Sequence, residues 1–404
     1  MKKYRLKLTA LTPIHIGTGE VYEPTNFVID NGYLYEFDEV EFYKNLDENK
    51  QKEFTQITQM QTKNGYELFE KIHKFVSNNK LIAIKVAHNK IVISKKFQEK
   101  YIKDIANKVQ VENNGNKSVF NKFEIQKTQR LKNEKNSVYI SGSSIKGAIS
   151  TAYQEMIYKN QGENGLKIFE KQKAFRNLSI SDTLYHKEVK SKISFAKNIE
   201  LFDNDGVTLS TMIEVIMPNS EFVITLDIKD FKDDDKNEIK EKITKEKLVQ
   251  ACKEHYQIIF DEKQNQPLQL NENQFIISIG KHSGARAVTI DGLRKILVKL
   301  CQIQNKRDEG NDPDKRVDRL HKKSHFESGK IKELFTNINL LNDKEKQNFN
   351  RAKHFIEAPE QLKNLVRNNR NVTINAILTQ ETTIWKFDDD NSSNSFGWIL
   401  CEVI

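Results

Sequence analysis

The chain has 404 residues, a length that predicts two domains at about 150 residues each. Its 23 Phe and 12 Tyr argue against intrinsic disorder, which is typically poor in aromatic residues. No apolar run reaches the roughly 18 residues that a membrane span requires, and the charged segment Lys2–Leu8 lacks the apolar core of a signal peptide. The three cysteines, Cys252, Cys301 and Cys401, form no CxxC pair, so a reducing cytoplasm is expected and a zinc ribbon is not.

The formal net charge is +9, from 65 basic and 56 acidic residues. Spread evenly over a chain of this size, that excess is small. It permits a polyanionic partner without establishing one, so the positions of the basic groups matter more than their sum.

The first elements are strands. Tyr4–Leu11 alternates apolar and polar residues, which predicts a half-buried strand, and 12–20 reads as a loop with two glycines. Asn31-Gly32 between Phe27–Ile29 and Tyr33–Tyr35 predicts a tight hairpin. Residues 39–110 have mostly helical spacing, with a strand-like apolar run at Leu81–Ala87, and 111–118 reads as a loop.

The middle of the chain predicts alternating helices and strands. Ile145–Ile157 carries one apolar stripe, which predicts a helix with Ser143 or Ser144 as its N-cap and with Lys146 exposed. Further elements follow: strands at Leu178–Asp182, Ile213–Met217 and Phe222–Ile228, a helix at about Lys245–Phe260, and a strand at Phe275–Ile279.

With insertions set aside, this order predicts an α+β fold with a βαββαβ core of the ferredoxin-like or RRM-like type. We assign 1–284 to this domain, with an insertion at about 39–137. Residues 285–404 form a C-terminal half, for which a second, degenerate ferredoxin-like unit is one interpretation. A boundary near 200 is an alternative to the one near 285.

Three glycine-containing loops, 15–20, 141–147 and 280–286, follow or flank predicted strands. Glycine allows a ligand to approach the backbone closely, and the N-terminus of a helix after 141–144 favours an anion. Each loop alone is also explained as a turn or a helix cap. Neither a P-loop nor a G-x-G-x-x-G fingerprint is present, so nucleotide hydrolysis is not expected.

The sequence around these loops resembles a known family. Leu11–Glu20 resembles the opening motif of the RAMP proteins, the RRM-based CRISPR-associated superfamily, and Ile140–Ala148 resembles their second signature. Within the superfamily, three segments are similar to the family formed by the fifth subunit of the type III-A Csm complex: Tyr22–Asp30, Gly280–Ala285 and Phe396–Leu400. The resemblance is weak in 39–137 and 305–375.

The resemblance implies a non-catalytic subunit of an antiviral ribonucleoprotein, binding CRISPR RNA at its 3′ end, capping the helical backbone of the complex and taking part in RNA maturation. Expected partners are CRISPR RNA, other Csm subunits, especially the backbone RAMP subunit, and host ribonucleases; no cofactor, metal or membrane is expected. The expected RNA-binding residues are His15, Gly17, Thr18, Gly19, Ser141, Gly142, Ser143, Ser144, Lys146, Gly280, Lys281, His282, Ser283, Gly284 and Arg286.

Two other functions stay open. His15 or His282 as a general base would make the chain a metal-independent endoribonuclease that processes CRISPR precursor RNA. The second open function is a scaffold that binds only protein and in which the glycine loops are plain turns. RNA cleavage in EDTA that is lost on His15→Ala would favour the enzyme, and crosslinking of RNA to the chain would exclude the scaffold.

Several other residue groups have simpler interpretations. We expect Tyr4, Phe275 and His255 to be core residues. His321 and His325, with Asp318 one turn earlier, fit a solvated helix better than a metal site. The basic residues from Lys306 to Lys323 form a solvated, RNA-facing or subunit-facing stretch, and the aspartate runs 233–235 and 388–390 serve solubility in loops.

Overall fold

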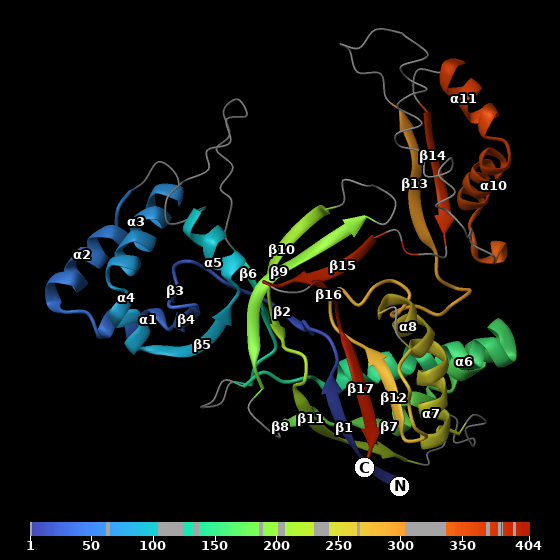
Figure 1. Cartoon of the computed structure of the whole chain (residues 1–404), viewed down its shortest axis with the longest axis horizontal. Coiled ribbons are helices and arrows are strands. Elements are labelled where there is room, and N and C mark those ends of the chain that lie inside the picture. The colour runs from blue at the N-terminus through green and yellow to red at the C-terminus, as the bar shows by residue number, and fades with distance from the viewer. Residues whose placement is uncertain are drawn as a thin grey trace.

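The computed structural model has an α+β fold with two large sheets and a smaller two-stranded one (Figure 1). It describes residues 2–61, 65–103, 124–131, 137–185, 189–200, 207–229, 242–264, 267–303, 337–368, 372–378, 381, 383–390 and 393–404. The loop expected at 111–118, Asp233–Asp235, the basic stretch 306–323, Asp318, His321 and His325 lie outside these residues. No helix within the described ranges is long and apolar enough to span a membrane.

The first sheet has six strands in the order β12-β17-β1-β11-β7, with β8 paired to β11. Its strands are β1 (Lys2–Ala10), β7 (Leu178–Ile180), β8 (Leu184–Tyr185), β11 (Glu221–Ile228), β12 (Gln274–Ser278) and β17 (Trp398–Val403). The predicted alternation of β1 is confirmed, since Leu6 and Leu8 are buried while Lys7 pairs with Glu221 at the surface.

One long helix and a broken one pack on this sheet (Figure 1). The long helix α6 (Gly142–Lys171) buries the predicted stripe from Ile145 to Ile157 and has a non-helical Gly162 with φ 68°. The second is α7 (Lys245–Cys252) and α8 (Ile258–Gln264), joined by a π-helical turn, η3 (Lys253–Gln257), that buries both His255 and Tyr256. A short 3₁₀ turn, η2 (Ala174–Asn177), leads from α6 into β7.

The ferredoxin-like order holds with one change. Helix α6 follows β1, and β7 and β11 come next, but the strand beside β1 on its other side is β17, from the end of the chain. The predicted fourth strand, β12, therefore lies one place further out and pairs with β17. The chain's last strand thus completes a sheet that its first strand begins.

The second sheet has nine strands, in the order β2-β6-β10-β9-β5-β4-β3, with β15 and β16 attached to β9. They are β2 (Gly17–Tyr22), β3 (Phe27–Asp30), β4 (Tyr33–Phe37), β5 (Ala87–Ile93), β6 (Ile125–Thr128), β9 (Ser191–Glu200), β10 (Val207–Ile216), β15 (Thr383–Asp388) and β16 (Ser393–Ser395). The predicted strands on either side of Pro218 therefore belong to different sheets, β10 to this one and β11 to the first.

The insertion packs its helices beside β3, β4 and β5. They are α1 (Glu39–Lys44), α2 (Glu48–Thr58), α3 (Gly65–Asn78), α4 (Lys80–Lys85) and α5 (Lys95–Tyr101). The hairpin at Asn31-Gly32 is confirmed, with φ angles of 48° and 79°. The strand expected at Leu81–Ala87 is wrong: most of that run is helix α4, whose Ala83 is fully buried, and the strand begins at Ala87.

The C-terminal third also holds β13 (Ile296–Ile303) paired with β14 (Val372–Leu378), the helices α10 (Asp343–Glu357) and α11 (Pro359–Asn368), and a 3₁₀ turn, η4 (Ile338–Leu340). Both large sheets take strands from either side of residue 285. The division into 1–284 and 285–404 stays a prediction.

Candidate nucleic-acid interface

The first and third glycine loops meet at one end of the six-stranded sheet. The backbone N–H of Lys281 donates a hydrogen bond to the His15 carbonyl oxygen over 2.9 Å. Gly280 has a φ of 83°, and a Cβ at this position would overlap the same carbonyl oxygen, so the contact requires glycine. Two segments 265 residues apart in sequence (280 minus 15) therefore form one surface region.

The closing strand joins them. The Gly397 N–H donates to the Pro13 carbonyl oxygen, and the Ile279 N–H donates to the Gly397 carbonyl oxygen, both over 2.9 Å. The Trp398 N–H donates to the hydroxyl of Thr12 over 3.0 Å. Three of the segments that carry the family resemblance are thus neighbours in space.

His15 is fully buried beneath this junction. Its Nδ1 donates to the Glu214 carbonyl oxygen over 2.7 Å, which leaves Nε2 as the unprotonated nitrogen. Burial lowers the pKa of His15, so the ring is neutral at pH 7. Nε2 has no hydrogen-bond partner among the described residues.

His282 lies in the third loop with a φ of 74°, a conformation that side chains other than glycine rarely adopt. Its ring centroid is 6.3 Å from that of His15 and 4.0 Å from Trp385. Burial lowers the pKa of His282 to about 3. Both imidazoles are therefore neutral hydrogen-bonding groups rather than cations.

The accessible groups of this region are few and small. Gly17, Thr18, Gly19 and Lys281 are exposed. The sequence predicted a loop at 12–20, but edge strand β2 already begins with Gly17, Thr18 and Gly19. Lys281 donates through Nζ to the Gln126 side chain over 2.9 Å. This region thus presents backbone groups, one hydroxyl and one lysine, and the exposed Glu20 on β2 adds a carboxylate.

The rest of the third loop is engaged internally. The Arg286 guanidinium pairs with Glu262, and its backbone N–H donates to Glu381 over 2.9 Å. Ser283 is buried and donates to the Gly280 carbonyl oxygen over 2.8 Å. A Cβ on Gly284 would overlap the same Glu381 carboxylate, which also pairs with Lys263 at 3.0 Å.

The second loop packs elsewhere, against β7 and the residues after it. Its N-cap is Ser141, not Ser143 or Ser144, because helix α6 begins at Gly142. The Gly142 N–H donates to the Asp182 carboxylate over 2.8 Å, so an internal anion already occupies the helix N-terminus. A Cβ on Gly142 would overlap the carbonyl oxygens of Ile180 and Ser181.

Lys146 in the second loop is partly buried, and the expected exposure is wrong. Its Nζ donates to the Leu178 carbonyl oxygen over 2.7 Å, and burial lowers its pKa. Of the loop's polar residues, Ser143 is exposed, while Ser141 and Ser144 share a hydroxyl hydrogen bond of 2.9 Å. The first and third predicted loops therefore come together, whereas the second loop packs against a different part of the fold.

A buried charge network beneath β2 was missed by the sequence analysis. Glu214, whose side chain is 0% exposed, accepts hydrogen bonds from the hydroxyl of Tyr22 over 2.9 Å and from the Thr128 N–H over 3.3 Å, and pairs with Arg130. Burial raises the pKa of Tyr22 well above its usual value. An acidic residue between the apolar Ile213 and Val215 was the one signal in the sequence.

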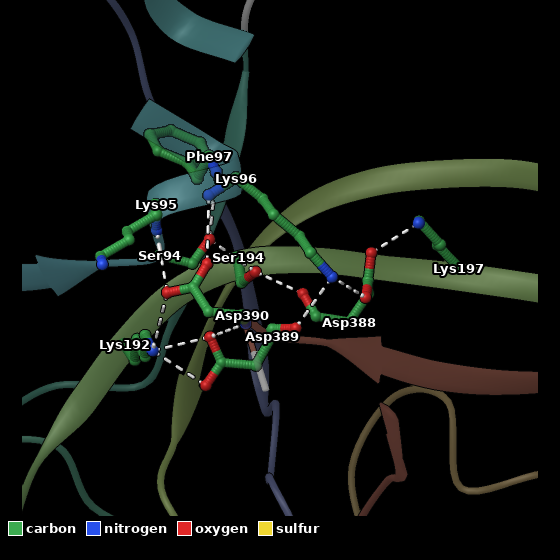
Figure 2. A network of polar contacts seen from close by, with 10 residues as sticks. All are labelled: Ser94, Lys95, Lys96, Phe97, Lys192, Ser194, Lys197, Asp388, Asp389 and Asp390. Atoms are coloured by element: carbon green, nitrogen blue, oxygen red, sulfur yellow. Dashed lines mark hydrogen bonds and ion pairs between the residues drawn. The ribbon is translucent and has the colours of Figure 1, made fainter. Parts of the chain in front are cut away.

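The aspartate run 388–390 is not a solvated loop feature, contrary to expectation (Figure 2). Asp388 pairs with Lys96 at 2.8 Å and with Lys197 at 2.5 Å, and Asp389 pairs with Lys192 at 2.6 Å. Asp390 accepts the backbone N–H groups of Lys95 and Lys96 over 3.0 and 3.1 Å.

His255 is a core residue, as predicted. Its Nδ1 lies 2.7 Å from the Glu155 carboxylate and its Nε2 lies 3.3 Å from the Ala287 carbonyl oxygen. Tyr4 and Phe275 pack with the core cluster of the six-stranded sheet, Tyr4 partly and Phe275 fully buried. In the part of the chain that the structure describes, no group of three or more His, Cys, Asp or Glu side chains is arranged to hold a metal ion.

Comparison with known proteins gives one family match and several similar chains. The family model described as the RAMP superfamily matches residues 7–367. A Streptococcus thermophilus protein named "CRISPR system Cms protein Csm5" is 27% identical over 172 residues, which cover 42% of each of the two proteins. The match thus spans less than half the length of that relative.

Two solved structures are similar in part. A chain in the "Cryo-EM structure of Csm-crRNA-target RNA ternary complex in type III-A CRISPR-Cas system" is 14% identical, with a TM-score of 0.46, covering 72% of this chain and 87% of that one. The "Crystal structure of T.onnurineus Csm5" is 15% identical, with a TM-score of 0.34, covering 55% and 67%.

Proposed function

Because this chain belongs to the RAMP superfamily, we propose that it is a CRISPR RNA-binding subunit of a type III-A Csm complex, holding the 3′ part of the guide and capping the backbone of the complex. Its named relative, Csm5 of Streptococcus thermophilus, supports this subunit assignment. The proposed partners are CRISPR RNA, the backbone RAMP subunit and, for trimming of the 3′ end, host ribonucleases. We propose a cytoplasmic location for the chain, as this role requires.

The junction of the first and third glycine loops is the observation that carries the proposal. It brings exposed Gly17, Thr18 and Gly19 on β2 beside exposed Lys281. A guide must be held whatever its spacer sequence, and that calls for amides, hydroxyls and lysines on phosphates and sugars rather than contacts to base edges. The exposed groups are of this kind.

A binding role fits the two histidines better than the alternative of a His general base in a metal-independent endoribonuclease. A general base must come within hydrogen-bonding reach of the ribose 2′-hydroxyl. His15 is 0% exposed and lies next to Gly17, while His282 is partly buried and packs beside the rings of His15 and Trp385. We therefore propose that the chain defines the end of the guide and does not cut RNA.

Sequencing of guide RNA from complexes purified with and without this subunit tests the proposal. The expected result is an unchanged 5′ end and 3′ ends of altered length, with the remaining subunits still assembled. Identical 3′ ends in both preparations would overturn the capping role. Incubation of the purified chain with repeat-containing RNA in EDTA tests the alternative, and cleavage lost in His15→Ala would establish the endoribonuclease instead.

A further inference from the structure

A cluster of three lysines lies at the joint between the insertion and the nine-stranded sheet (Figure 2). Lys96 is in α5, while Lys192 and Lys197 are in β9. Within residues 87–200, β5 pairs with β9 in parallel, and the Ser94 N–H before α5 donates to the Ile193 carbonyl oxygen over 3.0 Å; β15 of the C-terminal region also pairs with β9. The lysine surface, as we call Lys96, Lys192 and Lys197, is therefore a feature of residues 87–200.

The anions on this surface come from far along the chain: Asp388 is 292 residues from Lys96, and Asp389 is 197 residues from Lys192. Asp388 pairs with Lys96 and Lys197, and Asp389 pairs with Lys192. Asp390 accepts two backbone N–H groups and lies 3.8 Å from the Lys192 Nζ. Lysine Nζ atoms and backbone N–H groups are also what proteins use to bind phosphate oxygens in nucleic acids. Three consecutive carboxylates thus occupy the lysine surface in the way that a short stretch of phosphodiester backbone would.

The contacts are only partly open to solvent. The Lys96 and Lys197 side chains are 46% and 37% exposed, whereas Lys192 and the three aspartates are 13–22% exposed. Exchange therefore displaces a largely enclosed run of carboxylates, while the pairing of β5 with β9 stays in place. In addition, Lys386 lies directly across from Lys197 in the pairing of β15 with β9, which adds a fourth cation.

The lysine surface also lies close to the glycine-loop junction. Strand β15 ends in Asp388, and three residues earlier its Trp385 packs against His282 of the third loop, with the two ring planes tilted by 37°. At about 3.3 Å per residue, the two positions are about 10 Å apart along the strand. Because side chains alternate along a strand, Trp385 and Asp388 point to opposite faces of β15, so a guide that contacts both regions has to pass around the end of this strand.

From these observations we propose that Asp388–Asp390 is an internal competitor for RNA phosphates, which occupies the lysine surface in the free chain and yields Lys96, Lys192 and Lys197 to the guide. The inference rests on the proposed RNA binding. It adds a second RNA-contacting surface outside the glycine loops, together with the segment that covers it before the guide arrives.

Replacement of the three aspartates by asparagine tests this. Fluorescence anisotropy with a single-stranded guide RNA, at 50 to 200 mM salt, compares wild type with the triple variant Asp388→Asn, Asp389→Asn, Asp390→Asn. Three lysines released to phosphates make the slope of log affinity against log salt steeper by about 2 for a single strand. The affinity gain of the variant over wild type should then be roughly 15–20-fold larger at 50 mM than at 200 mM salt.

Two controls separate charge in general from this surface. Glu246, Glu254 and Glu272 are exposed around α7 and β12, and their replacement by Gln changes the net charge by the same amount. This control should move the slope little. Adding Lys96→Gln, Lys192→Gln and Lys197→Gln to the asparagine variant should return the slope to that of wild type.

Each result decides between the proposals. Salt-dependent binding by wild type with no gain in the asparagine variant overturns the competitor and leaves the proposed function standing. An equal gain in the glutamate control also overturns it. Absence of RNA binding by wild type and all variants overturns both. A single Asp389→Asn variant removes the shorter of the two carboxylate contacts of Lys192, since Asp390 stays at 3.8 Å. It should show a slope change of at most about 0.7 and serves if the triple variant melts early.

Discussion

The buried pair of Glu155 and His255 allows a quantitative test of how the six-stranded half is held together. The Glu155 side chain is 5% exposed, and its Oε2 lies 2.7 Å from His255 Nδ1 and accepts the Asp291 N–H over 2.8 Å. Its Oε1 pairs with Lys159 at 2.7 Å. Glu155→Gln keeps the size of the side chain and removes only the charge, so it isolates the electrostatic contribution.

Two independent arguments give a similar magnitude. Burial alone would raise the pKa of Glu155, but the hydrogen bonds and charges of His255 and Lys159 outweigh it and lower the pKa from 4.5 to about 2. A shift of about 2.5 units corresponds to about 3 kcal/mol at pH 7. Removing one partner of a buried ion pair costs about 3–5 kcal/mol. We therefore expect Glu155→Gln to lower the free energy of unfolding by about 3 kcal/mol.

The pH dependence has a definite sign. Because the pKa is depressed in the folded state, the stabilisation is complete above pH 4.5 or so and is lost as the pH falls toward 2. The difference between wild type and Glu155→Gln should thus shrink from about 3 kcal/mol at pH 7 to about 2 kcal/mol at pH 3.5. Urea unfolding followed by circular dichroism at several pH values measures it.

The same helix supplies the control. Glu163 pairs with Lys167 in the same i, i+4 arrangement at 2.8 Å, but its side chain is 42% exposed. Glu163→Gln should cost less than about 0.5 kcal/mol at pH 7. A cost below about 1 kcal/mol for Glu155→Gln, or a cost that is equal at every pH, would refute the reasoning.

Three further predictions concern the glycine loops. Gly142→Ala should destabilise the chain by about 1–3 kcal/mol in urea unfolding, because its Cβ would overlap backbone carbonyls, whereas Gly147→Ala, with open space around its Cβ, should be neutral or stabilising. Lys281→Gln should make the salt slope of RNA binding shallower by about 0.7, measured by anisotropy, and an unchanged slope would contradict a phosphate contact. His282 is neutral in the fold but charged in the unfolded chain at acid pH, so stability should fall below pH 6.5 by at most about 1.4 kcal/mol per unit, and His282→Asn should flatten that fall in pH-dependent melting.

Local patterns predicted local structure well. The alternation of β1, the Asn31-Gly32 hairpin and the apolar stripe of α6 each depend on residues within a few positions of one another. The run Leu81–Ala87 shows a case in which the local pattern did not predict the structure. A short apolar run fits a buried strand and a buried helical turn equally well, and packing decided the outcome by burying Ala83 in helix α4.

The partners of charged residues could not be predicted, because they are distant in sequence. Glu214 and Arg130 are 84 residues apart, and Asp388 and Lys96 are 292 apart. The sequence gives the type and sign of each group, but the opposing charge is placed by sheet topology. The position of β17 between β1 and β12 could not be read from patterns for the same reason.

The glycines of the resembling motifs divide into two groups by what surrounds them, and this affects what the resemblance can say about function. At Gly142 and Gly280 a Cβ would overlap a carbonyl oxygen of another segment, so the fold itself requires glycine whether or not RNA is bound. At Gly19 a Cβ would meet nothing within 4 Å, and at Gly17 its nearest neighbour would be His15 Nε2 at 3.2 Å. Both are exposed on β2. Gly19 has a φ of 84°, which favours glycine whether or not a ligand is bound, so its backbone conformation explains it. Gly17 has no positive φ, and only the ring of His15 limits the space for a Cβ there, so close approach of a ligand to the backbone is a further physical reason for glycine at this one position, next to Thr18.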